Sequence, residues 1–195
     1  MATAFKQPEQ EQIRTELRES AWRHACSDGM KNTTVDTLAA EAGISKGAFY
    51  HFYESKELLF LDVLSRWHER IFRSVEELLL RDQSLSPSQR ARVAFREGLK
   101  QLLYRPAARF VLAERKALLR RVPPEAARQL YHSDDELLER MMDLCGVRLT
   151  ISREQAIGVI RILLTSLMNA DDVGPSFDES LSILIDCACA QLIAD

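Results

Sequence analysis

The segment NTTVDTLAAEAGISKGAFYHFYESKELL, residues 32–59, contains two short amphipathic helical patterns on either side of a glycine. Apolar residues recur at helical spacing over 35–42 and again over 45–52, where two phenylalanines share one face. Gly43 lies between the two patterns and can take the left-handed backbone conformation that a tight turn needs. Two short helices joined by such a turn predict a helix-turn-helix.

A helix-turn-helix binds DNA by placing its second helix in the major groove, where residues near the helix N-terminus reach base edges. Outside the apolar face, the residues of 45–52 are small or carry hydrogen-bonding groups. The N-termini of this helix and its neighbours also offer backbone N–H groups and hydroxyls that favour phosphate. The expected DNA contacts are Thr33, Thr34, Ser45, Lys46, Gly47, Ala48, Tyr50, His51, Tyr53, Ser55 and Lys56.

Helical periodicity covers almost all of the remaining sequence, and no strand pattern or internal repeat interrupts it. A long pattern of about twenty-five residues begins at Ser55, which can cap it, and this pattern links the helix-turn-helix to the C-terminal part of the chain. We expect an all-α fold of about nine helices. The expected helices cover residues 9–28, 35–42, 45–52, 55–79, 88–104, 107–122, 124–147, 152–172 and 177–195.

Composition supports a mostly helical protein and argues against an all-β, a membrane-spanning or an exported protein. Of the 195 residues, 46% are hydrophobic and 28% charged, and the 7 Gly and 6 Pro are too few for the turns of an all-β chain. No apolar run is long enough to span a membrane, and the N-terminus lacks a signal-peptide pattern. The four cysteines have no spacing that suggests a disulfide or metal site, so we expect reduced thiols in a cytoplasmic protein without a membrane partner.

The sequence contains no catalytic motif: a Gly-rich phosphate loop, a nucleophile elbow and a metal-hydrolase motif are all missing. We therefore expect no enzyme activity, no cofactor and no metal. The net charge of −3 argues weakly against binding of nucleic acid through bulk electrostatics. Residues 31–56 carry three lysines and three acidic residues, so DNA binding would depend mainly on helix N-termini and hydroxyls.

Residues 13–64 resemble the DNA-binding region of TetR-family transcriptional regulators. The likeness lies in a Thr-Thr-Val helix start, an Ala-Gly-Ile-Ser turn, a Gly-Ala-Phe-Tyr recognition helix and a Ser-Lys-Glu start of the next helix. It implies a homodimer that binds double-stranded, palindromic operator DNA, usually as a repressor, and that an unknown small-molecule effector releases. Residues 1–57 would then bind DNA, and residues 58–195 would sense the ligand and dimerise.

The last two helical patterns, 152–172 and 177–195, are apolar on more than one face, whereas a terminal helix of a monomer needs one buried face. The second face predicts a partner subunit, and the resemblance implies a dimer through the same helices. The alternative is burial within one large monomer core. The expected interface residues are Val159, Ile160, Leu163, Leu164, Leu167, Leu181, Leu184, Ile185, Ala188 and Leu192.

A ligand cavity would have to lie among the helices between residues 58 and 170. Adaptable apolar side chains and single polar groups are typical of such pockets, although each candidate also fits an ordinary core or surface position. The candidates are Trp67, His68, Tyr104, Phe110, Arg115, Tyr131, Met141, Met142, Cys145 and Asn169.

Two other hypotheses remain at this point. A DNA-binding dimer without a small-molecule effector would be regulated by abundance or by a protein docked on the basic segment 105–121. An enzyme built on a helical bundle has no catalytic constellation to support it. A thermal-shift ligand screen separates the first of these from an effector-controlled regulator, because a ligand of the native state raises its stability.

Overall fold

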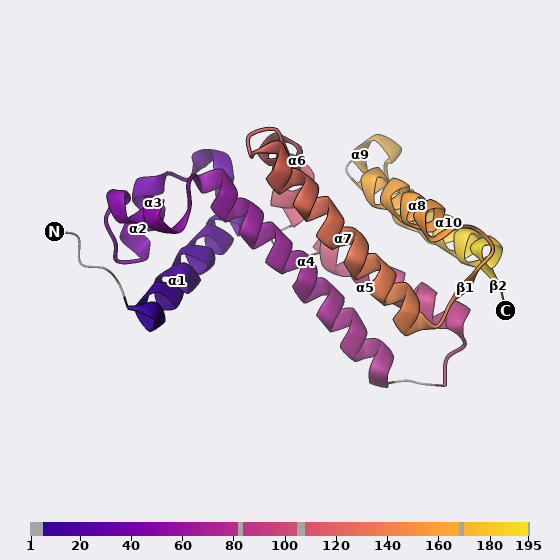
Figure 1. Ribbon diagram of the computed structural model, residues 1–195. Coiled ribbons are helices and arrows are strands. Elements are labelled where there is room, and N and C mark those ends of the chain that lie inside the picture. Colours follow the sequence, from indigo (N-terminus) through magenta and orange to yellow (C-terminus); the bar gives the residue numbers. More distant parts are fainter. Residues whose placement is uncertain (1–5, 82–83, 105–107, 168–169, 195) are drawn as a thin grey trace. The chain divides into compact units, whose positions relative to one another are not determined.

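The computed structural model describes residues 6–81, 84–104, 108–167 and 170–194, and it is almost entirely helical (Figure 1). The described residues form ten α-helices, one of them of only four residues, together with a 3-10 helix and a short strand pair. The all-α fold class expected from the sequence is confirmed. The elements are α1 (Gln7–Cys26), η1 (Met30–Asn32), α2 (Val35–Glu41), α3 (Lys46–Phe52), α4 (Lys56–Arg81), α5 (Pro87–Tyr104), α6 (Ala108–Leu119), α7 (Pro124–Cys145), β1 (Arg148–Leu149), α8 (Arg153–Ser166), α9 (Ala170–Val173), α10 (Phe177–Leu192) and β2 (Ile193–Ala194).

The chain packs as two compact units, and each is assembled from separated parts of the sequence. Unit 1 comprises Met1–Arg66 and Pro106–Leu130, so it contains the helix-turn-helix and α6. Unit 2 comprises Trp67–Arg105 and Tyr131–Asp195. The helices α4 and α7 each contribute residues to both units. The functional division after residue 57 stays a prediction, because the units are defined by packing.

A Schellman motif at Gly43 closes the turn between α2 and α3. Gly43 has a φ of 68°, in the left-handed region where a side chain would be strained. Its N–H donates to the carbonyl of Ala40 at 3.1 Å, and the N–H of Ile44 donates to the carbonyl of Ala39 at 3.0 Å. The left-handed turn expected from the sequence is confirmed, and it determines the direction in which α3 leaves α2.

Three helices of unit 1 begin at a hydroxyl-bearing residue. The side-chain oxygens of Thr34, Ser45 and Ser55 each accept the backbone N–H three residues further on, at 3.1, 3.1 and 3.2 Å. Each such cap contributes about 1 kcal/mol and satisfies an N–H that the helix leaves unpaired. The caps therefore place the N-termini of α2, α3 and α4 where the sequence predicts them.

The core of unit 1 gathers the apolar faces of its helices. Leu17 of α1, Leu38 of α2, Phe49 of α3 and Phe60 of α4 are all fully buried. The ring of Phe60 also lies 5.6 Å from the ring of Phe110, which α6 contributes. Burial of large side chains on every helix holds α3 in a defined position without using its outer face.

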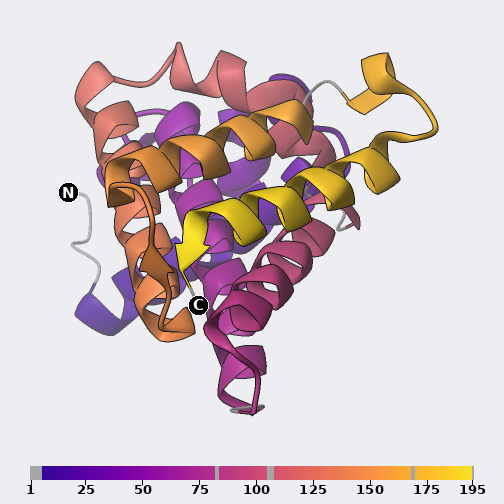
Figure 2. The same cartoon turned by 90° about the vertical axis from the view of Figure 1, so that its right-hand side faces the viewer.

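In unit 2, α10 packs against α5 and runs beside α8 (Figure 2). The exposed guanidinium of Arg96 joins α5 to α10. Its Nη2 donates to Asp186 at 2.8 Å and to Ser182 at 3.1 Å. Met142 of α7 forms a small apolar cluster with Ile157 of α8. The helices α5, α7, α8 and α10 therefore surround a shared interior.

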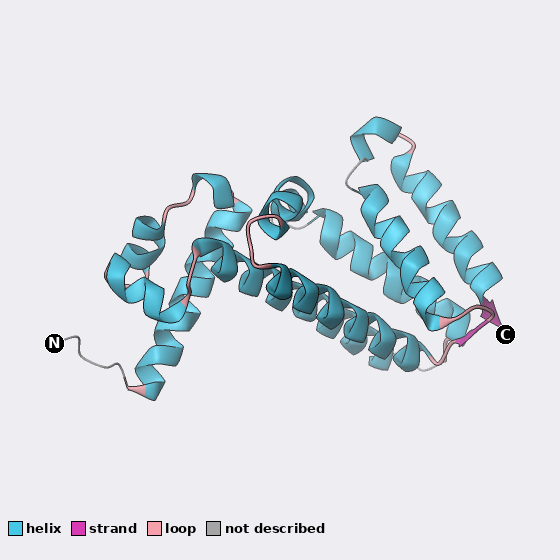
Figure 3. Ribbon diagram, turned by 45° about the horizontal axis from the view of Figure 1, so that its top comes forward, coloured by secondary structure: helices cyan, strands magenta, loops and turns pink. Residues whose placement is uncertain are grey.

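A two-residue antiparallel strand pair near the C-terminus departs from the expected all-helical pattern (Figure 3). Arg148 pairs with Ala194 and Leu149 pairs with Ile193. A strand of two residues is too short to produce a detectable alternation of apolar and polar residues, so sequence periodicity missed it. The pair ties the end of α10 to the segment that precedes α8.

Candidate DNA-binding surface and ligand cavity

One side of α3 is exposed to solvent, and the adjacent side is buried in the core of unit 1. Phe49 is fully buried, and Tyr50, the next residue along the chain, is 50% exposed. Lys46, Gly47 and His51 are also exposed. The helix thus presents an ammonium, an imidazole and a phenol next to a glycine that permits close approach. These groups can donate or accept hydrogen bonds at the edges of base pairs.

The ammonium of Lys46 has a partner on the preceding helix. Lys46 Nζ lies 2.8 Å from a carboxylate oxygen of Asp36, and both side chains are exposed. The hydrogen bond from Lys46 to Asp36 raises the pKa of the lysine, so it stays charged. Asp36 also lies in the first turn of α2, where a negative charge is favourable. Any DNA contact of Lys46 has to compete with this carboxylate.

Two further residues predicted to contact DNA have polar groups engaged inside unit 1. Thr33 is 2% exposed, and its hydroxyl donates to the carbonyl oxygen of Gly29 at 2.7 Å. Lys56 Nζ donates to the carbonyl oxygens of Met30 and Thr33 at 2.9 and 2.6 Å. The ammonium of Lys56 therefore holds η1 to the beginning of α4.

Tyr53, another predicted contact, belongs to a hydrogen-bonded cluster with α1 and α4. Its hydroxyl donates to Asp62 at 2.6 Å and accepts from Arg18 Nε at 3.2 Å, and Arg18 Nε also donates to Asp62 at 2.8 Å. Burial and the Asp62 carboxylate raise the pKa of Tyr53 to about 12. Burial alone would raise the pKa of Asp62, but hydrogen bonds from Tyr53 and Arg18 lower it overall. The cluster fixes the end of α3, and the sequence analysis did not identify it.

A second polar cluster joins α1 to the end of α2. Glu41 accepts hydrogen bonds from the Ser20 hydroxyl at 2.7 Å and from Arg23 at 2.8 Å, and the His24 ring lies 3.0 Å from its other oxygen. The hydrogen bond from Ser20 is the largest cause of a pKa of about 2 for Glu41, against a usual value of 4.5. Glu41 therefore stabilises the helix-turn-helix in its charged form.

The lowered pKa of Glu41 predicts a loss of stability in acid. Its contribution is fully present above pH 4.5 and disappears as the pH falls towards about 2. Glu41→Gln should lower the free energy of unfolding at pH 7 and flatten its fall between pH 4.5 and 2. Urea denaturation at a series of pH values measures this, with Glu19→Gln at an exposed position of α1 as the control. Equal pH profiles for Glu41→Gln and the unmodified protein would contradict the role of Glu41.

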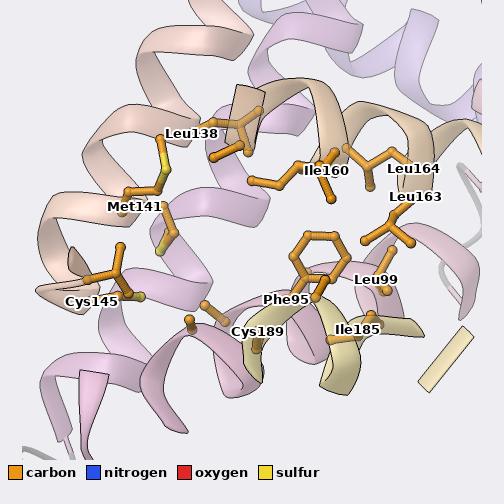
Figure 4. A pocket seen from close by; sticks show the side chains of 18 of the residues that line it. Phe95, Leu99, Leu138, Met141, Cys145, Ile160, Leu163, Leu164, Ile185 and Cys189 are labelled. Carbon is orange, nitrogen blue, oxygen red and sulfur yellow. The ribbon is translucent and has the colours of Figure 1, made fainter. Parts of the chain in front are cut away.

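Unit 2 contains an apolar cavity of about 180 Å³ among α4, α5, α7, α8 and α10, and the cavity is partly open to solvent (Figure 4). Three of the predicted ligand-binding residues, Met141, Met142 and Cys145, line it from α7. Seven of the predicted interface residues point to the same space from α8 and α10. They are Val159, Ile160, Leu163, Leu164, Ile185, Ala188 and Leu192.

Three other ligand candidates of unit 2 lie away from the cavity lining. Trp67 is 3% exposed in the core of unit 2. His68 Nδ1 lies 2.7 Å from Asp134, which joins α4 to α7. Tyr131 is 40% exposed, and the guanidinium of Arg161 lies over its ring at 5.6 Å from the centroid. The first two side chains are therefore parts of the packing between helices.

The remaining ligand candidates fall in unit 1 or outside the described residues. Phe110 is 3% exposed and packs against Phe60 in unit 1. Arg115 is half-buried on α6. The side chain of Tyr104 and the whole of Asn169 lie outside the part of the chain that the structure describes.

The outer face of α8 and α10 carries apolar side chains that the sequence analysis mostly missed. Ile162, Ile183 and Leu184 are 71%, 62% and 54% exposed. Leu184 is the one predicted interface residue in this group, whereas Leu167 and Leu181 are buried within unit 2. Helical periodicity identified two apolar faces on these helices but did not indicate which one turns inward.

Residues 17–63 match the family model of the bacterial regulatory proteins of the tetR family, and they cover the second half of α1 and all of the helix-turn-helix. The helix-turn-helix part of the chain is that of the tetR family. This confirms the resemblance found in the sequence. The family model describes regulatory proteins, and the curated relative PksA is named a transcriptional regulator.

Curated relatives match less than half of this chain. The HTH-type transcriptional regulator PksA of Bacillus subtilis is 27% identical over 77 residues, which is 40% of this chain and 38% of PksA. The HTH-type transcriptional repressor KstR2 of Mycolicibacterium smegmatis is 31% identical over 94 residues, which is 48% of this chain and 45% of KstR2. The matched stretch therefore spans less than half the length of each of these relatives.

The whole chain shares its fold with solved TetR structures. A TetR transcriptional regulator from Rhodococcus sp. RHA1 superimposes with a TM-score of 0.63 at 18% identity, covering 93% of this chain and 96% of that one. At this level of identity the likeness supports the fold.

Among the described residues, no helix is both long and apolar enough to cross a membrane. The same residues contain no group of three or more His, Cys, Asp or Glu side chains suited to a metal ion.

The match to the tetR family model ends within α4. The later helix α6 nevertheless packs against α1 and η1 in unit 1. Glu114 of α6 accepts the backbone N–H of Met30 at 2.6 Å. Gly29 has a φ of 81°, and a Cβ built on it would collide with the Glu114 carboxylate. Neither the spacing of residues nor the resemblance pointed to Glu114, because its partner lies 84 positions away.

Proposed function

We propose that this TetR-family protein is a transcriptional repressor that binds operator DNA as a homodimer and leaves it when a small molecule occupies the cavity of unit 2. The observation that carries the proposal is the exposed side of α3, with Lys46, Tyr50 and His51 beside Gly47. A recognition helix in the major groove presents residues of these types to the edges of base pairs. KstR2, a curated relative, is named a repressor, and this favours repression over activation.

Within this proposal, the predicted DNA contacts fall into two groups. Lys46, Gly47, Ala48, Tyr50 and His51 face base edges or the nearest phosphates from α3. The capped N-termini at Thr34, Ser45 and Ser55 provide N–H groups and hydroxyls for phosphate. Thr33, Tyr53 and Lys56 support these elements from behind through their hydrogen bonds inside unit 1.

The proposed dimer uses the exposed apolar face of α8 and α10. Ile162, Ile183 and Leu184 form its apolar centre, since large apolar side chains left in water favour association. An isologous pair of subunits has two-fold symmetry, and two recognition helices related in this way require a palindromic operator.

Ligand control follows from the cavity and from α4. The cavity in unit 2 favours a small-molecule effector over regulation by protein docking or abundance. Since α4 contributes residues to both units, a ligand that prefers one arrangement of α4 can change the affinity for DNA. DNA must weaken ligand binding by the same factor. A regulator of bacterial genes meets its DNA in the cytoplasm, where we place this protein.

DNA recognition by α3 is tested by selection from a random duplex library, followed by fluorescence anisotropy on the enriched DNA at fixed salt. We expect a two-fold symmetric consensus and a loss of affinity of about tenfold or more for Tyr50→Ala or Lys46→Ala. Asp36→Asn should tighten binding, because it removes the carboxylate that competes for Lys46. Lys100→Ala, at an exposed lysine of α5, is the charge-matched control.

Three outcomes would contradict all or part of this proposal. Equal affinity for all four variants and the unmodified protein would mean that α3 does not recognise the DNA. A library without enrichment over the input would mean that the protein has no operator of its own. An unsymmetrical consensus would overturn the dimeric part of the proposal and leave the role of α3 in place.

A further inference from the structure

The cavity of unit 2 is lined by apolar and sulfur-containing side chains. Side chains from α5, α7, α8 and α10 converge on it, among them Phe95, Met141, Ile160 and Ile185 (Figure 4). None of the described residues that line it is charged or carries an amide, imidazole or hydroxyl side chain. Its most polar side chains are the thiols of Cys145 and Cys189 and the thioethers of two methionines.

The two thiols do not provide charge at neutral pH. Burial raises the pKa of the Cys145 thiol to about 11, and burial also raises the pKa of the Cys189 thiol. A thiol is a weak hydrogen-bond donor and a weak acceptor. A carboxylate or ammonium placed in this cavity would lose its hydration without gaining an ionic or strong hydrogen-bonding partner, which is costly. The cavity therefore discriminates against charged ligands.

The volume of the cavity limits the size of its ligand. An apolar cavity of about 150 Å³ in a protein interior stays dry and binds benzene. The cavity described here has a similar volume, about 180 Å³, and is partly open to solvent. Its wall includes the ring of Phe95 and the sulfur of Met141, and both groups interact favourably with the edges of aromatic rings.

We propose that the effector site takes an uncharged, hydrocarbon-like molecule of the size of a substituted benzene ring. This inference rests on the proposed function, in which the cavity ligand releases the repressor from DNA, and it specifies the chemical class of that ligand. Shape and apolar area determine selectivity in such a site, because its walls offer no directional polar group to a ligand.

The test compares three molecules built on the same ring. Purified protein is titrated with ethylbenzene, with benzoate and with benzylammonium, and the melting temperature is measured at each concentration. Ethylbenzene should raise the melting temperature in a saturable manner, because it binds the native state, and the two charged molecules should not. Stabilisation by benzoate or benzylammonium alone, or by hexadecanoate in place of ethylbenzene, would overturn the proposal.

Two glycine substitutions locate the binding event. Gly98 on α5 lines the cavity, and a Cβ built on it meets no atom within 4 Å, so Gly98→Leu adds a side chain at the cavity wall where a Cβ has room. Gly158 on α8 is equally open but does not line the cavity, so Gly158→Leu is the matched control. We expect Gly98→Leu to abolish the ethylbenzene shift while the protein still unfolds cooperatively, and Gly158→Leu to retain the shift. Retention of the shift in Gly98→Leu would place the ligand elsewhere.

An anisotropy measurement on operator DNA separates failure of this inference from failure of the proposed function. Release of DNA by ethylbenzene in the unmodified protein, but not in Gly98→Leu, supports both. Binding of ethylbenzene without release leaves the ligand class standing and overturns the effector role. Release by a charged ring and not by ethylbenzene overturns the ligand class and leaves ligand control in place.

Discussion

Phe49→Ala should lower the free energy of unfolding by about 3–5 kcal/mol, the usual cost of removing a large aromatic side chain from a core. Phe49 is fully buried on the inner side of α3. Proteins of this size are stable by about 5–15 kcal/mol, so the loss removes a large part of the stability. Urea denaturation followed by circular dichroism measures the change.

Tyr50→Ala is the matched control for this prediction, because it removes a similar ring from the adjacent position. Tyr50 is 50% exposed, so its loss should change the unfolding free energy by less than about 1 kcal/mol. The two variants should thus separate folding from recognition: Phe49→Ala affects both, and Tyr50→Ala affects DNA affinity alone. A large loss of stability in Tyr50→Ala would mean that its ring supports the fold.

The double variant Ile183→Glu, Leu184→Glu should convert the proposed dimer into monomers and lower operator affinity by roughly 100-fold or more. Both side chains are apolar and more than half exposed on α10. Glutamates at these positions would have to be desolvated and brought close to their symmetry mates in an isologous interface. Analytical ultracentrifugation gives the subunit number, and fluorescence anisotropy gives the affinity.

Leu80→Glu serves as the control for surface charge. Leu80 is 52% exposed, close to the 54% of Leu184, but it lies near the end of α4. It should leave both the dimer and the operator affinity unchanged. A double variant that remains dimeric would place the interface on another surface of the protein.

The sequence predicted those features of the fold that depend on neighbouring residues. The cap at Ser55 and the left-handed Gly43 follow from interactions within a few positions, so residue type and spacing sufficed. The alternation of buried Phe49 and exposed Tyr50 follows from helical geometry in the same way.

Features that depend on distant residues were not accessible to the same reasoning. Lys56 could have faced a phosphate, but the carbonyl oxygens of Met30 and Thr33, 26 and 23 positions earlier, hold its ammonium. Tyr53 could have been exposed, but Arg18 and Asp62 bind its hydroxyl. The chemistry of each side chain allowed both outcomes, and only tertiary packing decides between them.

The last two helices illustrate a different limit. Leu184 and Ile185 are adjacent apolar residues, yet one is 54% exposed and the other 3%. A helix with apolar residues on two faces gives the same periodic signal whichever face turns inward. Most of the predicted interface residues consequently line the cavity, and Ile162 and Ile183, outside the predicted set, form the exposed face.

The contact of Glu114 with Met30 limits how the DNA-binding segment of this protein can be fused to other domains. The DNA-reading module is discontinuous along the chain, because α6 packs on it from far downstream. A gene fusion that joins the first 66 residues to a foreign sensor would leave the N–H of Met30 without its carboxylate and Phe60 without the Phe110 ring. A chimeric regulator built from this chain therefore has to carry both segments, or replace the second with a helix that bears an acid and an aromatic residue at matching positions.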